Sequence, residues 1–308
     1  MMATLAGDQE KLAIFAQHDG FVFDLDGTVW RGTQLIPGAA EVISLLRQQG
    51  KRVFFVTNNA NSRANVVKKL KKCGIQAFDE EVYTSAYAAA VTLSQAKNKH
   101  KKAYVIGEAG LVDELTLAGI TVLGGPQDSD KAFDFTSDPS MSHLDPSVTA
   151  VVVGLDKQIN YYKLQTAQAY IVVHKAQFIA TNTDARGNLS SQDEWAGAGT
   201  MVAAVIGCSE AEPIVVGKPQ TLIMDLLSKA SGITRNRLMV VGDRLDTDIA
   251  WGKRCGTGTL LVLTGCTSEE QLIANTDASK RPDLYIKTIG DLLSVTTKLN
   301  SWDTCNVS

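Results

Sequence analysis

Residues 21–28 read Phe-Val-Phe-Asp-Leu-Asp-Gly-Thr, an apolar run that leads directly into two aspartates two positions apart. The run predicts a buried strand, and Asp24 and Asp26 stand where that strand gives way to a loop. Side chains two positions apart in an extended chain point the same way. Two carboxylates on one face repel each other, which favours a bound cation or a shared proton. Because ligands gather at the carboxyl ends of parallel strands, this stretch predicts a functional site.

Outside this stretch, short apolar runs alternate with helical patterns, which predicts a parallel sheet flanked by helices. Pro37 is placed to begin one helix, Gly50 to end it, and Ser62 to cap the next. The expected strands are residues 21–25, 53–56, 103–106, 121–123, 148–154, 177–181, 213–216, 237–241 and 258–263. Further helices are expected near residues 86–95, 110–118, 220–230 and 246–254.

The alternation falls into two parts, which predicts two domains of the α/β class. We expect a parallel-sheet core made of residues 1–81 and 206–308, interrupted by an inserted α/β cap of residues 82–205. Within the cap, residues 124–147 are rich in Gly, Pro, Ser and Asp and are expected to form a long surface connection. A chain of 308 residues is long enough to build both cores.

Net charge, pI, the cysteine pattern and the length of the apolar runs restrict which partners and which cellular compartment we expect. A net charge of −3 and a pI near 5.8 give no reason to expect a nucleic acid partner. Five scattered cysteines without CxxC spacing argue against a disulfide framework or a zinc site, and they suit a reducing compartment. No stretch approaches the roughly 18 apolar residues of a membrane helix, and the N-terminus lacks the apolar run of a secretory signal. We therefore expect a soluble, cytoplasmic protein that binds neither nucleic acid nor membrane.

Polar groups stand at the ends of four expected strands, and together they suit phosphoryl transfer. That reaction needs a nucleophile, a cation, a fixed positive charge and hydrogen-bond donors around one phosphorus. If the four strands are neighbours, these groups meet on one rim of the sheet. They are Asp24 with Asp26, Thr57 with Asn58, Lys218, and Asp243 with Asp248.

Each group has a role that its chemistry favours. Asp24 can attack phosphorus and form an aspartyl-phosphate. Mg²⁺ prefers a few carboxylate and carbonyl oxygens, which Asp24, Asp243 and the backbone carbonyl of Asp26 can supply. Lys218 can bind phosphate and hold Asp24 ionised, while Thr57 and the N–H groups after it can donate to phosphate oxygens. The Asp26 carboxyl can give a proton to the leaving oxygen and later take one from the attacking water.

The motifs are in the order found in haloacid-dehalogenase-type phosphatases, which this chain resembles over nearly its whole length. More closely, it resembles the NagD and para-nitrophenylphosphatase branch, which includes phosphoglycolate phosphatase and pyridoxal phosphatase. The motifs are Asp24-Leu25-Asp26-Gly27-Thr28, Thr57-Asn58-Asn59, Ala180-Thr181-Asn182-Thr183-Asp184, Gly197-Ala198-Gly199-Thr200, Gly217-Lys218-Pro219 and Gly242-Asp243-Arg244-Leu245-Asp246-Thr247-Asp248. The resemblance implies a Rossmann-like core with a large α/β cap inserted after the second motif.

The resemblance also implies a role for each residue of the site. Asp24 is then the nucleophile and Asp26 the general acid and base. The phosphate-binding residues are Thr57, Asn58, Asn59 and Lys218. The Mg²⁺ ligands are Asp24, the Asp26 carbonyl and Asp243, with Asp248 orienting a water molecule on the metal.

In relatives the loop after Asp184 reaches from the cap over the site and helps to choose the substrate. Here it reads Asp184-Ala185-Arg186-Gly187-Asn188, without the proline or aromatic residue that relatives often carry. This departure weakens the transfer of any one substrate, although Arg186 is a candidate contact for an anionic tail. The expected partner is therefore a small phosphorylated metabolite. Phosphoglycolate, pyridoxal phosphate and other esters stay open, with para-nitrophenyl phosphate as a surrogate and a homodimer through the cap expected from relatives.

Other interpretations remain for the parts and for the whole. Alone, Asp24 and Asp26 could cap a turn, and Thr57 and Asn58 could mark a helix entry; the four motifs together favour a site. A phosphotransferase or phosphomutase of the same superfamily would pass the phosphoryl group to a substrate instead of water. A non-catalytic phospho-accepting signalling protein would keep it. Bacterial receiver domains, however, place the accepting aspartate after an acidic pair and the lysine last. A dehalogenase does without an aspartate in the role of Asp26.

Overall fold

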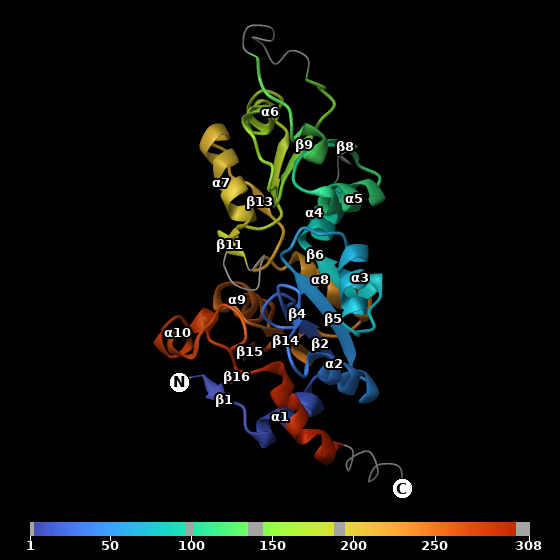
Figure 1. Cartoon of the computed structure of the whole chain (residues 1–308), viewed down its shortest axis with the longest axis vertical. Coiled ribbons are helices and arrows are strands. Elements are labelled where there is room, and N and C mark those ends of the chain that lie inside the picture. The colour runs from blue at the N-terminus through green and yellow to red at the C-terminus, as the bar shows by residue number, and fades with distance from the viewer. Residues whose placement is uncertain (1–2, 97–100, 135–143, 188–194, 300–308) are drawn as a thin grey trace.

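Two separate parallel sheets organise the chain, one at each end of an elongated molecule (Figure 1). The structure is a computed structural model that describes residues 3–96, 101–134, 144–187 and 195–299. Within these ranges the larger sheet has seven strands and the smaller has five. The expected α/β fold class is confirmed. The predicted surface connection at 124–147 and the predicted loop at 184–188 extend partly outside the described residues, at 135–143 and Asn188.

The larger sheet has the order β1-β16-β15-β14-β2-β5-β6. Its strands are β1 (Thr4–Leu5), β2 (Gly20–Phe23), β5 (Arg52–Thr57), β6 (Val82–Thr84), β14 (Leu238–Gly242), β15 (Gly258–Val262) and β16 (Leu284–Ile286). The helices around it are α1 (Asp8–Gln17), α2 (Ala39–Gln48), α3 (Arg63–Lys72), α8 (Leu222–Ser231), α9 (Ala250–Cys255) and α10 (Glu269–Ala274).

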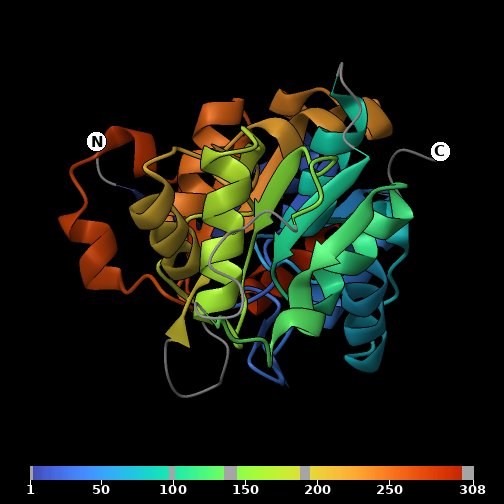
Figure 2. The ribbon, with the colours of Figure 1, turned by 90° about the horizontal axis from the view of Figure 1, so that it is seen from above.

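The smaller sheet has the order β13-β10-β9-β7-β8 and is also flanked by helices, as the view from above shows (Figure 2). Its strands are β7 (Lys102–Ile106), β8 (Thr121–Gly124), β9 (Ala150–Val153), β10 (Gln177–Ala180) and β13 (Ile214–Val215). Its helices are α4 (Ser85–Gln95), α5 (Ala109–Leu117), α6 (Tyr161–Val172) and α7 (Ala198–Ser209). Two short antiparallel pairs complete the strands: β3 (Trp30–Arg31) with β4 (Gln34–Leu35), and β11 (Arg186–Gly187) with β12 (Trp195–Ala196).

The central strands of the larger sheet are buried on both faces, which explains their unbroken apolar runs. In β2, Phe21 and Phe23 face one hydrophobic cluster together with residues of α1, α2 and α3. Val22, between them, faces the opposite cluster together with residues of α8 and α9. The alternation follows from the two-residue period of an extended strand.

This second cluster continues from the larger sheet into the smaller one. It joins Val22 and Phe54 of the larger sheet to Leu93 of α4, and these to Val105 and Val152 of the smaller sheet. Burial of apolar surface therefore helps to hold the two sheets together.

Strand membership does not coincide with the expected domain boundaries. Val82–Thr84 hydrogen-bonds with β5 and belongs to the larger sheet, although the cap was expected to begin at residue 82. Ile214–Val215 pairs with β10 and belongs to the smaller sheet, although the core was expected to resume at residue 206. Judged by the strands alone, the cap would begin after Thr84 and the core would resume after Val215. The domain division itself stays a prediction.

The helix expected at 246–254 is two elements. Residues Leu245–Ile249 form a π-helical turn, and α9 follows from Ala250. Wide turns of this kind are frequent at functional sites. Sequence patterning did not reveal α1 or the short strands β1, β6 and β16. None of the helices in the described part of the chain combines the length and the apolar character that a bilayer-spanning segment requires.

Candidate active site

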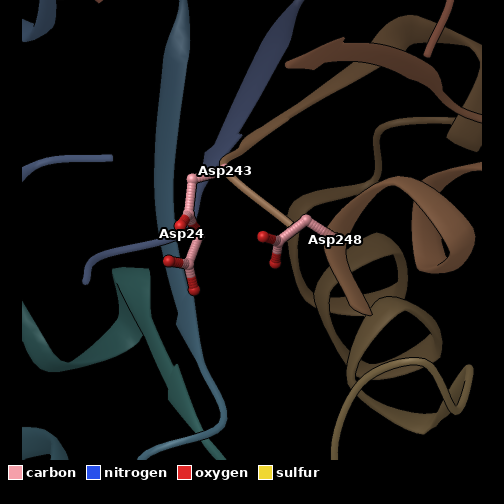
Figure 3. A group of neighbouring side chains, drawn as sticks. All are labelled: Asp24, Asp243 and Asp248. Carbon is pink, nitrogen blue, oxygen red and sulfur yellow. The ribbon is translucent and has the colours of Figure 1, made fainter. Parts of the chain in front are cut away.

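Three neighbouring strands of the larger sheet end at one rim, and each delivers a predicted site residue there. The strands β14, β2 and β5 are adjacent, and Asp243, Asp24 and Thr57 stand at their carboxyl ends. Figure 3 shows the carboxylates of Asp24, Asp243 and Asp248 turned toward one another. One oxygen from each lies within 4.8 Å of the other two. The structure therefore brings these three acids together.

Lys218 reaches the same place from the other sheet. It follows β13, which pairs with β10 in the smaller sheet, so the condition that all four strands are neighbours is not met for this residue. The convergence itself is present: Lys218 Nζ donates to Asp24 Oδ1 and to Asp248 Oδ1, both at 2.6 Å, and to the carbonyl of Val56 at 3.1 Å. Its side chain is only 3% exposed, so these ion pairs are formed out of contact with bulk water.

The cluster contains three acids and one lysine, and this excess of acidic groups shifts the pKa values of its members. Burial raises the pKa of Asp24 well above its ordinary value, against the attraction of Lys218. Burial and repulsion from Asp248 raise the pKa of Asp243 to about 7. Burial alone would lower the pKa of Lys218, but attraction to Asp24 and Asp248 outweighs it and raises that pKa. Three acids thus share one buried lysine, and a further cation would favour full ionisation.

The residues present fit a divalent metal ion. Asp243 Oδ2 accepts a hydrogen bond from the Cys266 N–H at 2.6 Å, while Oδ1 is buried and has no hydrogen-bond partner among the described residues. A buried carboxylate oxygen without a partner is costly unless a cation binds it. Gly27 and Gly265 leave room for this carboxylate, because a Cβ at either position would overlap with it. Asp243 and Asp24 are therefore the residues that would hold Mg²⁺, an ion that favours carboxylate oxygens.

Asp248 is engaged in a different way from Asp243. Its Oδ1 accepts from Lys218, and its Oδ2 accepts from the Arg244 N–H at 3.1 Å. Through these two hydrogen bonds Asp248 positions Lys218 and the turn after β14. This arrangement agrees with the expected orienting role, although the role toward a metal stays a prediction.

Asp26 lies at the edge of the cluster with its carboxyl in the cavity. Its Oδ1 accepts a hydrogen bond from Trp30 Nε1 at 2.8 Å. Burial raises the pKa of Asp26, and the nearby Lys69 and the Trp30 hydrogen bond oppose this shift. A carboxyl with a raised pKa can carry and release a proton near neutral pH, as a general acid requires.

The last residue of β5 and the loop after it supply the three residues predicted to bind phosphate. Thr57 is buried, and its Oγ1 accepts from the Asn59 N–H at 3.0 Å. Asn58 has a role that the sequence did not indicate. Its side-chain amide donates to Asp184 Oδ2 and to the Lys218 carbonyl, both at 3.0 Å, and its Oδ1 accepts from the Lys218 N–H at 2.7 Å. The amide thus joins the cap to the lysine loop, and the prediction that Asn58 binds phosphate rests on its backbone N–H.

Core and cap together enclose a cavity of about 110 Å³. Every predicted site residue lines it except Asp243, which lies beside Asp24 (Figure 3). The cap contributes Asp184 and the exposed Arg186, while the core adds Arg244, which sequence reasoning missed. Arg244 pairs with Asp246 and donates to the Arg186 carbonyl at 3.4 Å.

Comparison with known proteins matches both halves of this site. A family model described as haloacid dehalogenase-like hydrolase matches residues 21–121, and a second, HAD-hydrolase-like, matches residues 215–292. The chain is 46% identical over 288 residues to "Phosphoglycolate phosphatase 2" of Arabidopsis thaliana, covering 92% of this chain and 95% of that protein. It is 37% identical over 306 residues to "Glycerol-3-phosphate phosphatase" of Rattus norvegicus, covering 94% of each.

A solved structure shows the same arrangement of elements. The glycerol phosphate phosphatase of Mycobacterium tuberculosis in complex with magnesium matches with a TM-score of 0.76 and 30% identity, covering 91% of this chain and 77% of that one. The same protein has been solved in complex with calcium.

Proposed function

We propose a specific reaction for this chain from the premise that it belongs to the haloacid dehalogenase-like hydrolases and is a phosphoric monoester hydrolase. The reaction is Mg²⁺-dependent hydrolysis of a small phosphate monoester through an aspartyl-phosphate on Asp24. One observation carries the proposal: Asp24 is hydrogen-bonded to a buried lysine and lies beside a buried Asp243 oxygen that has no hydrogen-bond partner in the described part of the chain. A carboxylate in such a setting is activated as a nucleophile toward phosphorus.

In the first half of the reaction, an Asp24 oxygen forms a bond to phosphorus as the bond to the ester oxygen breaks. The Asp26 carboxyl gives its proton to the leaving oxygen. Lys218 and the donors of the Thr57 loop hold the phosphoryl oxygens, where negative charge is greatest in the transition state. When bound at Asp24 and Asp243, Mg²⁺ supplies further charge neutralisation at those oxygens.

In the second half, water attacks phosphorus and the bond between phosphorus and Asp24 breaks. Asp26, now ionised, takes the proton from that water and returns to its starting state. The names of the relatives favour transfer to water over the phosphotransferase and signalling alternatives. The predicted homodimer through the cap and the cytoplasmic location stay predictions.

For the substrate, we propose a small ester with a short anionic tail, of which phosphoglycolate is the leading candidate. The exposed Arg186 in the cavity wall and the relative named phosphoglycolate phosphatase support this choice. Glycerol phosphate, which lacks a carboxylate, is the main competitor.

Replacing Arg186 with Ala tests the proposed tail contact. A hydrogen bond to a charged group contributes about 1.5–3 kcal/mol, so kcat/KM for phosphoglycolate should fall roughly 10–100-fold. For para-nitrophenyl phosphate, which has no anionic tail, the change should stay within about threefold. Steady-state kinetics on both substrates measure this, and Arg31→Ala, an exposed arginine of β3, serves as the control. Equal losses on both substrates would contradict the tail contact.

Metal removal tests the proposed Mg²⁺ site with a readout that does not depend on turnover. EDTA should abolish activity, and Mg²⁺ at about a hundred times its Kd should stabilise the protein by about 2.7 kcal/mol. Because the pKa of Asp243 is raised to about 7, the proton must leave before metal binds, so Mg²⁺ stabilisation should grow as pH rises toward 7. Thermal melts with EDTA or Mg²⁺ measure this. The Asp243→Asn variant should show little Mg²⁺-dependent shift; a full shift there would place the metal elsewhere.

A further inference from the structure

Trp30 makes a contact with Asp26 that the reaction scheme has not used. It opens the β3–β4 pair directly after the acidic motif and is only 2% exposed. Its indole Nε1–H donates to Asp26 Oδ1 at 2.8 Å. The Gly27 N–H donates to the Trp30 carbonyl at 2.7 Å, and this hydrogen bond closes the turn between Asp26 and Trp30. The backbone of this turn therefore places the indole N–H within hydrogen-bond distance of one Asp26 carboxylate oxygen.

Lys69 fixes the indole ring from the side of α3. Its ammonium lies 3.9 Å from the centre of the Trp30 ring and donates to the Gly32 carbonyl at 3.1 Å. A cation over an indole face is attracted to it by about 0.5–2 kcal/mol. Since α3 begins just after the Thr57 loop, Lys69 ties the β3–β4 pair to the element that follows the phosphate-binding loop.

We propose that Trp30, held in place by Lys69, is a positioning residue for Asp26. The indole N–H restrains Asp26 Oδ1, which leaves Oδ2 to face the leaving oxygen of the ester in the cavity. Asp26 lines that cavity and Trp30 does not, so Trp30 acts through the carboxyl and not by touching substrate. This inference rests on the proposed role of Asp26 as the general acid.

The chemistry of the leaving group separates this role from a purely structural one. An alkyl phosphate releases an alkoxide, which must be protonated as it leaves, whereas para-nitrophenolate departs without a proton. A misplaced general acid therefore slows the first ester and spares the second. A general loss of structure slows both. The ratio of kcat/KM values for glycerol 3-phosphate and para-nitrophenyl phosphate is the readout, because kcat/KM reports the first bond cleavage.

Two variants remove the contact in different ways. Trp30→Phe deletes the N–H, and a benzothienylalanine at position 30 deletes it while keeping the shape of the ring. Either should lower kcat/KM for glycerol 3-phosphate at least about tenfold, a part of the ~10²–10⁴ that a general acid supplies. Para-nitrophenyl phosphate should change by less than about threefold. Lys69→Met, which keeps the length of the side chain, should shift the ratio in the same direction by a smaller factor.

Matched controls come from the same chain. Trp251→Phe removes another buried indole, whose N–H has no partner among the described residues, and should leave the substrate ratio unchanged. Lys68→Met removes an exposed lysine next to Lys69 on α3 and should do the same. In an Asp26→Asn background, Trp30→Phe should cause no further change in the ratio, because the group it positions is gone.

The outcomes are distinguishable. Equal losses on both esters in the benzothienylalanine protein, or an unchanged ratio, would overturn the positioning role while leaving the proposed function intact. An Asp26→Asn variant whose losses do not depend on the leaving group would instead overturn the assignment of the general acid. A shifted ratio in the Trp30 variants, absent in the controls and in the Asp26→Asn background, supports the proposal.

Discussion

Asp24→Asn is expected to lower kcat by on the order of 10⁶, the scale on which hydrolases lose activity when a covalent nucleophile is removed. An amide has the size of the carboxylate but lacks the charge needed to attack phosphorus. The fold should survive, because Lys218 keeps its ion pair with Asp248 at 2.6 Å. Loss of activity with an unchanged melting profile is therefore the expected result.

The covalent step can be observed directly. Rapid quenching during turnover, followed by borohydride reduction, converts an aspartyl-phosphate into homoserine, which peptide mass spectrometry can place at position 24. Asp246→Asn is the control, because this exposed acid lies in the turn after β14, near Asp243 and Asp248, and pairs with Arg244. Homoserine at another position would contradict the assignment of Asp24 as the nucleophile. Turnover by Asp24→Asn within tenfold of the wild type would do the same.

Lys218→Met is expected to have the largest effect on stability. Lys218 is the partner of two buried carboxylates, Asp24 and Asp248, and removing one side of a buried ion pair typically costs about 3–5 kcal/mol. Activity should also fall by at least roughly 10²–10³, since the fixed positive charge beside the nucleophile and the transferring oxygens is lost. The two effects have one cause, which is the loss of the buried positive charge.

Urea unfolding in EDTA measures the stability change. Burial already raises the pKa of Asp24, and Lys218 opposes that shift, so without the lysine Asp24 ionises less readily in the folded state than in the unfolded state. The variant should therefore gain stability as pH falls from 8 toward the unfolded pKa of an aspartate, near 4. The double variant Lys218→Met with Asp248→Asn should recover part of the loss, because only one of the two acids remains without a partner. A single variant as stable as the wild type in EDTA at pH 8 would contradict this account.

The sequence predicted the central strands and most of the site for a simple physical reason. Strands buried on both faces carry unbroken apolar runs, and β2, β5 and β14 are adjacent in the sheet. Polar residues immediately after such runs lie at the same rim. Asp24, Thr57 and Asp243 were therefore brought together by reasoning that needed only local patterns.

The rest depends on contacts between distant segments, which local patterns do not encode. β13 has only two residues, and nothing in its composition says which sheet it joins. Asn58 contacts Asp184 and Lys218 across 126 and 160 positions of the chain, so its bridging role is visible only in three dimensions. The wide turn at Leu245–Ile249 was expected as ordinary helix because its periodicity differs little from one.

The origin of Lys218 has a consequence for how such a protein can be divided. The lysine follows a strand of the smaller sheet, and its loop is tied to Asn58 and, through it, to Asp184. Excising the inserted region to obtain a minimal hydrolase would remove the anchor of the one cation that neutralises Asp24. The insert is thus not a detachable module. The position of Lys218 beside Asp24 depends on the insert, so a chimera that exchanges inserts must take residues 214–218 from the same protein as the insert.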